Sequence, residues 1–147
     1  MAVKYHTPHK RHRMTYFIRN AVDCCRKGNN RQVEMRLNEI YLENLWASQK
    51  GRCAYTRQPM IMPTVPVKNG RNFTFPKDVN MAYAASIDRI DSSQGYVPGN
   101  VQFICRFINL GKQDLTDSQV REFLANVVAK WSVPVDDLIG LEPNLES

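Results

Sequence analysis

Hydrophobic residues recur at helical spacing in two stretches of the first third of the chain. A helix is expected directly after residues 1–14, with one apolar face made of Phe17, Ile18, Ala21, Val22 and Cys25. The turn-forming KGNN stretch at residues 27–30 ends it. A second helix is expected over about residues 33–49, with an apolar stripe made of Val33, Leu37, Ile40, Tyr41 and Leu45.

A third amphipathic helix is expected over residues 116–133. Thr116 and Gln119 form a T-x-x-Q capping box, in which each side chain binds the backbone N–H of the other residue. The apolar face behind this cap consists of Val120, Phe123, Leu124, Val127, Val128 and Trp131. Pro134 stops the helix, and residues 134–147 form an acidic tail.

Between these helices the pattern changes to that of strands and turns. PMIMPTVPVKNGRNFTF, residues 59–75, carries three prolines and an Asn69-Gly70 pair, which predicts a hairpin or an ordered loop. MAYAASID at residues 81–88 predicts a strand, SSQGYVPG at 92–99 a loop, and NVQFIC at 100–105 a returning strand. A short helix follows, so the order here is strand, loop, strand, helix.

Composition adds a marked asymmetry of charge. Apolar residues at 43% and charged residues at 23% are typical of a folded domain, and 147 residues suit one α+β domain. Residues 1–36 hold nine of the 20 Lys and Arg residues and two of the 14 Asp and Glu residues. A basic N-terminal region on a nearly neutral body suits binding to nucleic-acid phosphates. The alternative is a solvated arm that favours solubility.

The location is predicted from what the chain lacks. No apolar run is long enough to span a membrane, and MAVKYHTPHKRHR at the N-terminus has no signal-peptide core. We therefore expect a cytoplasmic protein that does not bind membranes and whose four cysteines stay reduced.

The strand–loop–strand–helix segment carries candidate metal ligands. Asp88 falls near the end of the first strand, and Asn109 lies on the short helix beside it. A carboxylate and an amide oxygen, with water and phosphate oxygens in the other positions, suit Mg²⁺ or Mn²⁺. Asn100 is expected to hydrogen-bond the loop backbone, and Lys112 is expected to reach a phosphate. Taken one by one, these residues also fit a surface ion pair and an ordinary turn.

Four short patterns follow one another between residues 88 and 112: D-R-I at 88–90, N-V-Q at 100–102, C-x-x-x-N at 105–109 and N-x-x-K at 109–112. Together they resemble the HNH, or ββα-metal, endonuclease motif. They are most similar to a subgroup of phage and mobile-element proteins that reads S-L-D-R-I-D-S-S-K-G-Y and then G-N-V-Q. QKGRCAYTRQPM at residues 49–60 also resembles the segment that precedes the motif in such proteins.

The resemblance implies how the chain is organised. It covers roughly residues 37–115 and implies a mainly helical α+β domain built around a ββα-metal motif at 84–113. Residues 1–36 would be a basic arm and first helix, and residues 116–133 a C-terminal helix.

Many relatives hold a structural zinc ion with two Cys-x-x-Cys knuckles. Each knuckle keeps one cysteine here, in Cys53-Ala-Tyr-Thr56 and Cys105-Arg-Phe-Ile108. Two thiols alone make a poor zinc site, so we predict no structural zinc. Cys53 and Cys105 are instead expected to pack near each other as small core residues. Cys24 and Cys25 are expected to pack within the first helix rather than bind a metal.

Arg89 stands where the commoner family pattern has the histidine that accepts a proton from the attacking water. Arginine stays protonated, so its expected role is to clamp the scissile phosphate. The proton acceptor is left open among Asp91, Tyr96 and the three histidines at positions 6, 9 and 12. In a regular strand Asp91 points away from Asp88. A phenol needs activation to act as a base at neutral pH.

The resemblance implies a metal-dependent endonuclease that hydrolyses DNA, either nicking it or cutting both strands. The residues expected to contact DNA are Lys10, Arg11, Arg13, Arg19 and Lys112. Two alternatives remain: a catalytically inactive nucleic-acid-binding protein on the same scaffold, and a nuclease directed at RNA, since phosphate contacts do not distinguish the two sugars.

Overall fold

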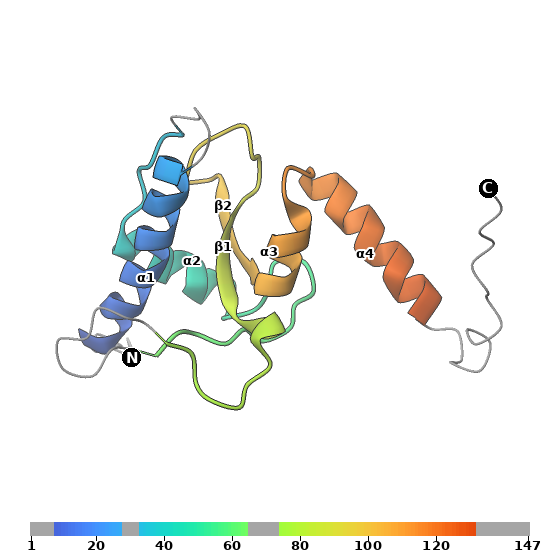
Figure 1. Ribbon diagram of the computed structural model, residues 1–147, viewed down its shortest axis with the longest axis horizontal. Coiled ribbons are helices and arrows are strands. Elements are labelled where there is room, and N and C mark those ends of the chain that lie inside the picture. Colours follow the sequence, from blue (N-terminus) through green and yellow to red (C-terminus); the bar gives the residue numbers. More distant parts are fainter. Residues whose placement is uncertain (1–7, 28–32, 65–73, 132–147) are drawn as a thin grey trace, which may run out of the picture.

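The computed structural model describes residues 8–27, 33–64 and 74–131; in the first of these ranges it describes the side chains of residues 14–25. This part of the chain has an α+β architecture with four α-helices and a two-stranded antiparallel sheet (Figure 1). The elements are α1 (Pro8–Lys27), α2 (Glu39–Ser48), the 3₁₀-helix η1 (Met81–Tyr83), β1 (Ala85–Arg89), β2 (Val101–Cys105), α3 (Arg106–Lys112) and α4 (Asp117–Trp131). No described helix is both long and apolar enough to cross a membrane.

The sheet lies at the centre of the core, with α1 and α2 on one side and α3 on the other (Figure 1). β1 and β2 pair in a register that sets Ile87 opposite Phe103 and Asp88 opposite Gln102. Every residue of β2 is buried. The rings of Phe17 and Trp46 meet Phe103 edge-on, with centroids 5.0 and 5.1 Å away. Aromatic burial from three elements therefore fixes the sheet against the helices.

The basic arm is shorter than predicted, because α1 begins at Pro8 and residues 8–14 are helical. Proline is well suited to the first turn of a helix, where its missing N–H is not needed. The predicted apolar face is largely confirmed: Phe17 and Ala21 are buried, and Ile18 and Cys25 pack against the core.

The prediction that the second helix starts near residue 33 is wrong, since α2 begins at Glu39. Asn38 caps it by accepting a hydrogen bond from the Tyr41 N–H at 2.9 Å. The residues before the cap are not helical, and the backbone carbonyl oxygen of Glu34 accepts a hydrogen bond from the Tyr96 N–H at 2.8 Å. This pairing holds the segment beside the loop that leads into β2.

The predicted apolar stripe of this segment is confirmed in part: Leu37 is buried, and Tyr41 and Leu45 pack against the core. Leu42, outside the predicted stripe, is fully buried, whereas Ile40 is 60% exposed.

The close approach of residues 33–38 to the loop requires Gly95. A Cβ atom at this position would lie 2.1 Å from the carbonyl oxygen of Glu34, far inside van der Waals contact. Glycine is the residue that permits such a backbone approach.

The predicted order of strand, loop, strand and short helix is confirmed. The first residues of the predicted strand at 81–88 instead form η1, where the Asn80 side chain accepts a hydrogen bond from the Ala82 N–H at 3.0 Å. The capping box of α4 is also confirmed: the Thr116 N–H donates to Gln119 Oε1 at 2.8 Å, and the Gln119 N–H donates to Thr116 Oγ1 at 3.2 Å. The Asn69-Gly70 turn and the acidic tail lie outside the described residues.

Candidate functional site

A cleft of about 610 Å³ runs beside β1, between α1 and α3. Four of the predicted site residues line it: Asp88, Arg89, Tyr96 and Asn109. Three others, Asp91, Asn100 and Lys112, are not among its lining residues. The cleft therefore brings the two predicted metal ligands to one place, but not the whole predicted set.

Asp88 is buried, and each of its carboxylate oxygens accepts one hydrogen bond. Lys112 Nζ donates to Oδ1 at 3.1 Å, and Gln102 Nε2 donates to Oδ2 at 3.0 Å. Burial raises the pKa of Asp88 above its ordinary value, and these two partners only partly oppose the shift. Because a carboxylate has about four acceptor positions, both oxygens keep room for a further partner.

Asn109 is held with a defined orientation. Its Nδ2 donates to Ser86 Oγ at 2.6 Å and to the carbonyl oxygen of Ile87 at 3.0 Å. Both amide hydrogens are thereby directed at β1, so Oδ1 is the end of the amide that remains as an acceptor.

Lys112 does not take the predicted place at a phosphate. Its side chain is 1% exposed, and its Nζ donates to Asp88 Oδ1 and to the Arg89 carbonyl oxygen. The packing of α3 on β1 turns the end of the helix inward, so this cation compensates a buried carboxylate. The role assigned to Lys112 is thus corrected from DNA contact to partner of Asp88.

Arg89 is half-buried at the end of β1, and the loop positions its guanidinium group. Nη1 donates to the carbonyl oxygens of Ser92 at 2.8 Å and Gln94 at 3.0 Å. The guanidinium carbon lies 5.3 Å from the centre of the Tyr96 ring. These contacts fix the group on one side and leave its other N–H donors for an anion.

Asp91 is not positioned to accept a proton in the cleft. Its Oδ1 accepts hydrogen bonds from the N–H and hydroxyl of Ser93, and its Oδ2 accepts one from Gln94 Nε2. These bonds lower its pKa, which makes the carboxylate a weaker base. Asp91 shapes the loop, which corrects its candidacy as a catalytic group.

Tyr96 lines the cleft but is a poor base. Its side chain is buried, and burial raises the pKa of the phenol above its ordinary value. The hydroxyl therefore keeps its proton across the physiological pH range.

Asn100 ties the loop together, as predicted. Its Oδ1 accepts a hydrogen bond from the Asp91 N–H, and its Nδ2 donates to the carbonyl oxygens of Asp91 and Gly95, all at 3.0 Å. The side chain is buried, so it satisfies three backbone groups that lie largely away from water.

Asn100→Ala is expected to lower the free energy of unfolding by about 2–4 kcal/mol, since it leaves these backbone groups without partners. Urea denaturation followed by circular dichroism measures the change. Asn38→Ala is the matched control, because it removes one exposed helix cap and should lower stability by about 1 kcal/mol. Equal losses in the two variants would contradict a special role for Asn100.

Four of the five residues predicted to contact DNA lie on α1. The side chains of Lys10, Arg11 and Arg13 lie outside the described part, as do those of all three histidines. Arg19 is exposed on α1. The DNA-binding role of these residues stays a prediction.

The cleft also contains a carboxylate that the sequence pattern did not indicate. Asp23 lies on α1 and lines the wall that faces β1 and α3. It is separated from Asp88 by more than sixty residues, so no motif links the two. The Asp23 residue is exposed to solvent.

A polar network behind Asp88 was also missed. Gln102 Nε2, which binds Asp88, also donates to the Tyr55 hydroxyl at 3.1 Å. The Tyr55 ring in turn lies 5.0 Å from the guanidinium carbon of Arg121 on α4. Gln102 was recognised as part of N-V-Q, but Tyr55 belongs to a distant segment that only the fold brings near.

Cys53 and Cys105 pack together in the core, as predicted. Both are buried, and the Cys105 N–H donates to Cys53 Sγ at 3.3 Å. Burial raises the pKa of the Cys105 thiol to about 12, which disfavours the thiolate that a metal would require. The absence of a structural zinc ion stays a prediction.

No group of three or more His, Cys, Asp and Glu side chains that could hold a metal occurs in residues 8–27, 33–64 and 74–131. No family model, curated protein or solved structure is significantly similar to this chain.

Proposed function

We propose that this chain is a metal-dependent endonuclease of the HNH type that hydrolyses DNA phosphodiester bonds. The proposal rests above all on the shared cleft of Asp88, Arg89 and Asn109, which unites a carboxylate, a cation and an amide. The strand–loop–strand–helix order and the motif resemblance support it. The excess of positive charge in residues 1–36 suits a polyanionic substrate.

The residues fit a weakly held divalent cation. Asp88 would supply an anionic oxygen, and Asn109 would supply its amide oxygen, since its nitrogen is directed at β1. Mg²⁺ commonly binds through one or two protein oxygens together with water and substrate phosphate. When bound, the ion would stabilise the charge that develops on the leaving oxygen.

Arg89 would bind the phosphate itself. Its contacts with Ser92, Gln94 and Tyr96 fix the guanidinium in the cleft without using all of its donors. A fixed cation at this point favours the transition state, in which negative charge increases on the phosphate oxygens.

Asp23 is the best candidate for the proton acceptor among the described residues. Asp91 and Tyr96 are disfavoured by their hydrogen bonds and burial, whereas Asp23 is an exposed carboxylate in the cleft. It lies on α1, whereas Asn109 lies on α3, so the two side chains line the cleft from different helices. In-line displacement requires the attacking water and the leaving oxygen on opposite sides of phosphorus, so the proton acceptor would have to act from the side away from the leaving oxygen.

Asp23→Asn is expected to slow single-turnover cleavage by about 10²-fold, within the range for loss of a positioned base. Asp114→Asn is the matched control, because it removes another carboxylate from the same cleft and should leave the cleavage rate nearly unchanged. If Asp23→Asn cleaves at the wild-type rate, the proton acceptor lies elsewhere.

One observation favours a second function, the binding of nucleic acid without cleavage. Both oxygens of Asp88 already have partners, and one of these is the cation of Lys112, which opposes binding of a second cation nearby. A protein that binds nucleic acid without cutting it would keep Asp88 paired with Lys112 and would bind no metal ion there.

Cleavage assays separate these functions. The protein is incubated with supercoiled plasmid, linear duplex or single-stranded RNA, in the presence of Mg²⁺, Mn²⁺ or EDTA. Relaxed or linear plasmid that forms only with a metal ion supports the proposed nuclease. Cleavage of RNA alone would change the proposed substrate from DNA to RNA. Binding of duplex DNA without product under every condition would support the inactive binding protein and overturn the proposal.

A further inference from the structure

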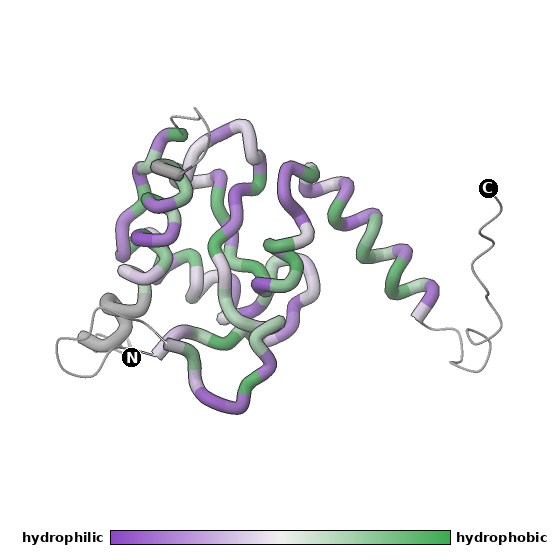
Figure 2. The backbone as a smooth tube through the Cα atoms, in the orientation of Figure 1, coloured by the Kyte–Doolittle hydropathy of each residue, from purple (hydrophilic) through white to green (hydrophobic). Residues whose placement is uncertain are grey.

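Helix α4 projects away from the body of the molecule (Figure 1). Its first turn is attached to the body: Val120 is buried, and the guanidinium of Arg121 lies over the Tyr55 ring. Beyond that turn the apolar face predicted from the sequence is largely uncovered, with Phe123 65% and Trp131 82% exposed. Figure 2 shows hydrophobic positions recurring along the helix before its last two residues.

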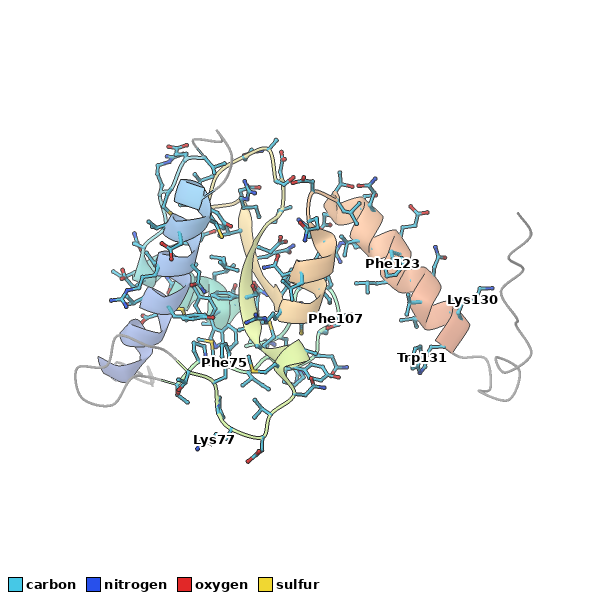
Figure 3. The ribbon with its side chains drawn as sticks, viewed as in Figure 1. Phe75, Lys77, Phe107, Phe123, Lys130 and Trp131 are labelled. Atoms are coloured by element: carbon cyan, nitrogen blue, oxygen red, sulfur yellow. The ribbon has the colours of Figure 1, made fainter. Side chains whose placement is uncertain are left out.

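The uncovered face of α4 borders an apolar groove. Leu124 and Val127 form one side of this groove, and Tyr83, Phe107 and Ile108 form the other. Phe107, on α3, is 74% exposed. Figure 3 shows Trp131 and Lys130 projecting from different sides of the last turn of α4, so the helix is amphipathic to its end. The molecule thus presents an apolar ridge and an apolar groove side by side.

We propose that this face binds the same face of a second copy of the chain, with each α4 docked into the groove of the other. A two-fold pair requires a self-complementary surface, and the adjacent ridge and groove provide one. A helix this short is marginally stable in water without packing, so we expect its apolar stripe to be buried against another surface.

The exposed side chains of this face supply much of the area that a stable dimer buries. An aromatic side chain buries roughly 150–250 Å² when fully covered, so Phe107, Phe123 and Trp131 alone expose on the order of 450 Å² per chain. This is more than half of the approximately 800 Å² that each partner contributes to a standard interface, and Val127 and Tyr83 add to it.

The charge of α4 favours a second copy over a nucleic acid or a membrane. The helix carries Asp117, Glu122, Arg121 and Lys130, so its net charge is zero. A nucleic-acid surface or an interfacial membrane helix would be strongly basic on its polar side. Two neutral helices pack together without repulsion.

Sedimentation velocity of the full chain over about 1–100 µM tests the proposal. At the upper concentrations we expect wild type to show an apparent molecular mass twice that of the 17.0 kDa chain. Phe123→Ser combined with Trp131→Ser should weaken association by about 100-fold or more, because large aromatic residues dominate interface energies. Ile40→Ser removes another well-exposed apolar residue, on α2, and should leave the dimer intact.

Hydrogen exchange locates the contact independently of these variants. Amides of residues 117–131 should exchange more slowly at 100 µM than at 1 µM. Wild type that stays monomeric at 100 µM would overturn the proposal, as would a dimer that the double substitution leaves unchanged. Neither result depends on whether the protein cleaves DNA.

Discussion

Asp88→Asn is expected to reduce metal-dependent cleavage by at least about 10³-fold while the protein stays folded. The substitution keeps the size of the side chain and an oxygen that can accept the Lys112 hydrogen bond. It removes the negative charge that would hold the cation in the cleft. Single-turnover cleavage of a labelled duplex at saturating Mg²⁺ measures the loss, and thermal unfolding monitors the fold.

DNA affinity separates a catalytic defect from a binding defect. Removing a negative charge from the cleft should leave the affinity for duplex in EDTA unchanged or slightly tighter. Asp78→Asn, which removes an exposed carboxylate outside the cleft, should retain full cleavage. If Asp88→Asn cut DNA as fast as wild type, Asp88 would not be a metal ligand.

Asn100 shows which parts of the site local sequence determines. Its three partner groups lie within nine residues along the chain, and the loop between them contains Gly95 at the point of closest backbone approach. A short polar loop between two strand patterns leaves few other partners for a buried amide. The T-x-x-Q cap of α4 is equally local, and it was predicted for the same reason.

Lys112 shows that the local sequence pattern does not determine where a side chain points. Its spacing from Asn109 places it one turn along α3, but the direction of its side chain depends on how α3 packs on β1. Asp88, its partner, is 24 residues away. A lysine stem can lie on apolar surface and carry its charge either to solvent or to a buried acid, and the sequence does not distinguish these outcomes.

Asn38 is a case where the signal was present in the sequence. An asparagine directly before Glu39 is typical of a helix N-terminus, yet the apolar spacing on both sides of it suggested a continuous helix. The backbone of Glu34 pairs instead with that of Tyr96, more than sixty residues away, and this pairing competes with extension of the helix towards residue 33. Asp23 was missed for a similar reason, since only the packing of α1 across the sheet brings it to the cleft.

Lys112→Met is expected to lower the free energy of unfolding by about 3–5 kcal/mol at neutral pH, because it leaves the buried Asp88 carboxylate without its cation. Methionine keeps most of the apolar stem, so the loss is mainly electrostatic. The double variant Asp88→Leu with Lys112→Met should recover much of this loss, since neither charge is then buried. A double-mutant cycle of urea unfolding measures the coupling.

The pH dependence of the Lys112→Met variant follows from the pKa of Asp88. Burial already raises this pKa in the folded state, and loss of the cation should raise it further. A carboxyl group whose pKa is higher in the folded state than in the unfolded state stabilises the protein most when it is protonated. The free energy of unfolding therefore falls as the pH rises from about 4, the ordinary carboxyl pKa, towards the raised pKa of the folded state. The deficit of Lys112→Met relative to wild type should therefore shrink as the pH is lowered from 8 to 5. A deficit that stays constant over this range would mean that Lys112 stabilises the protein by packing rather than by charge.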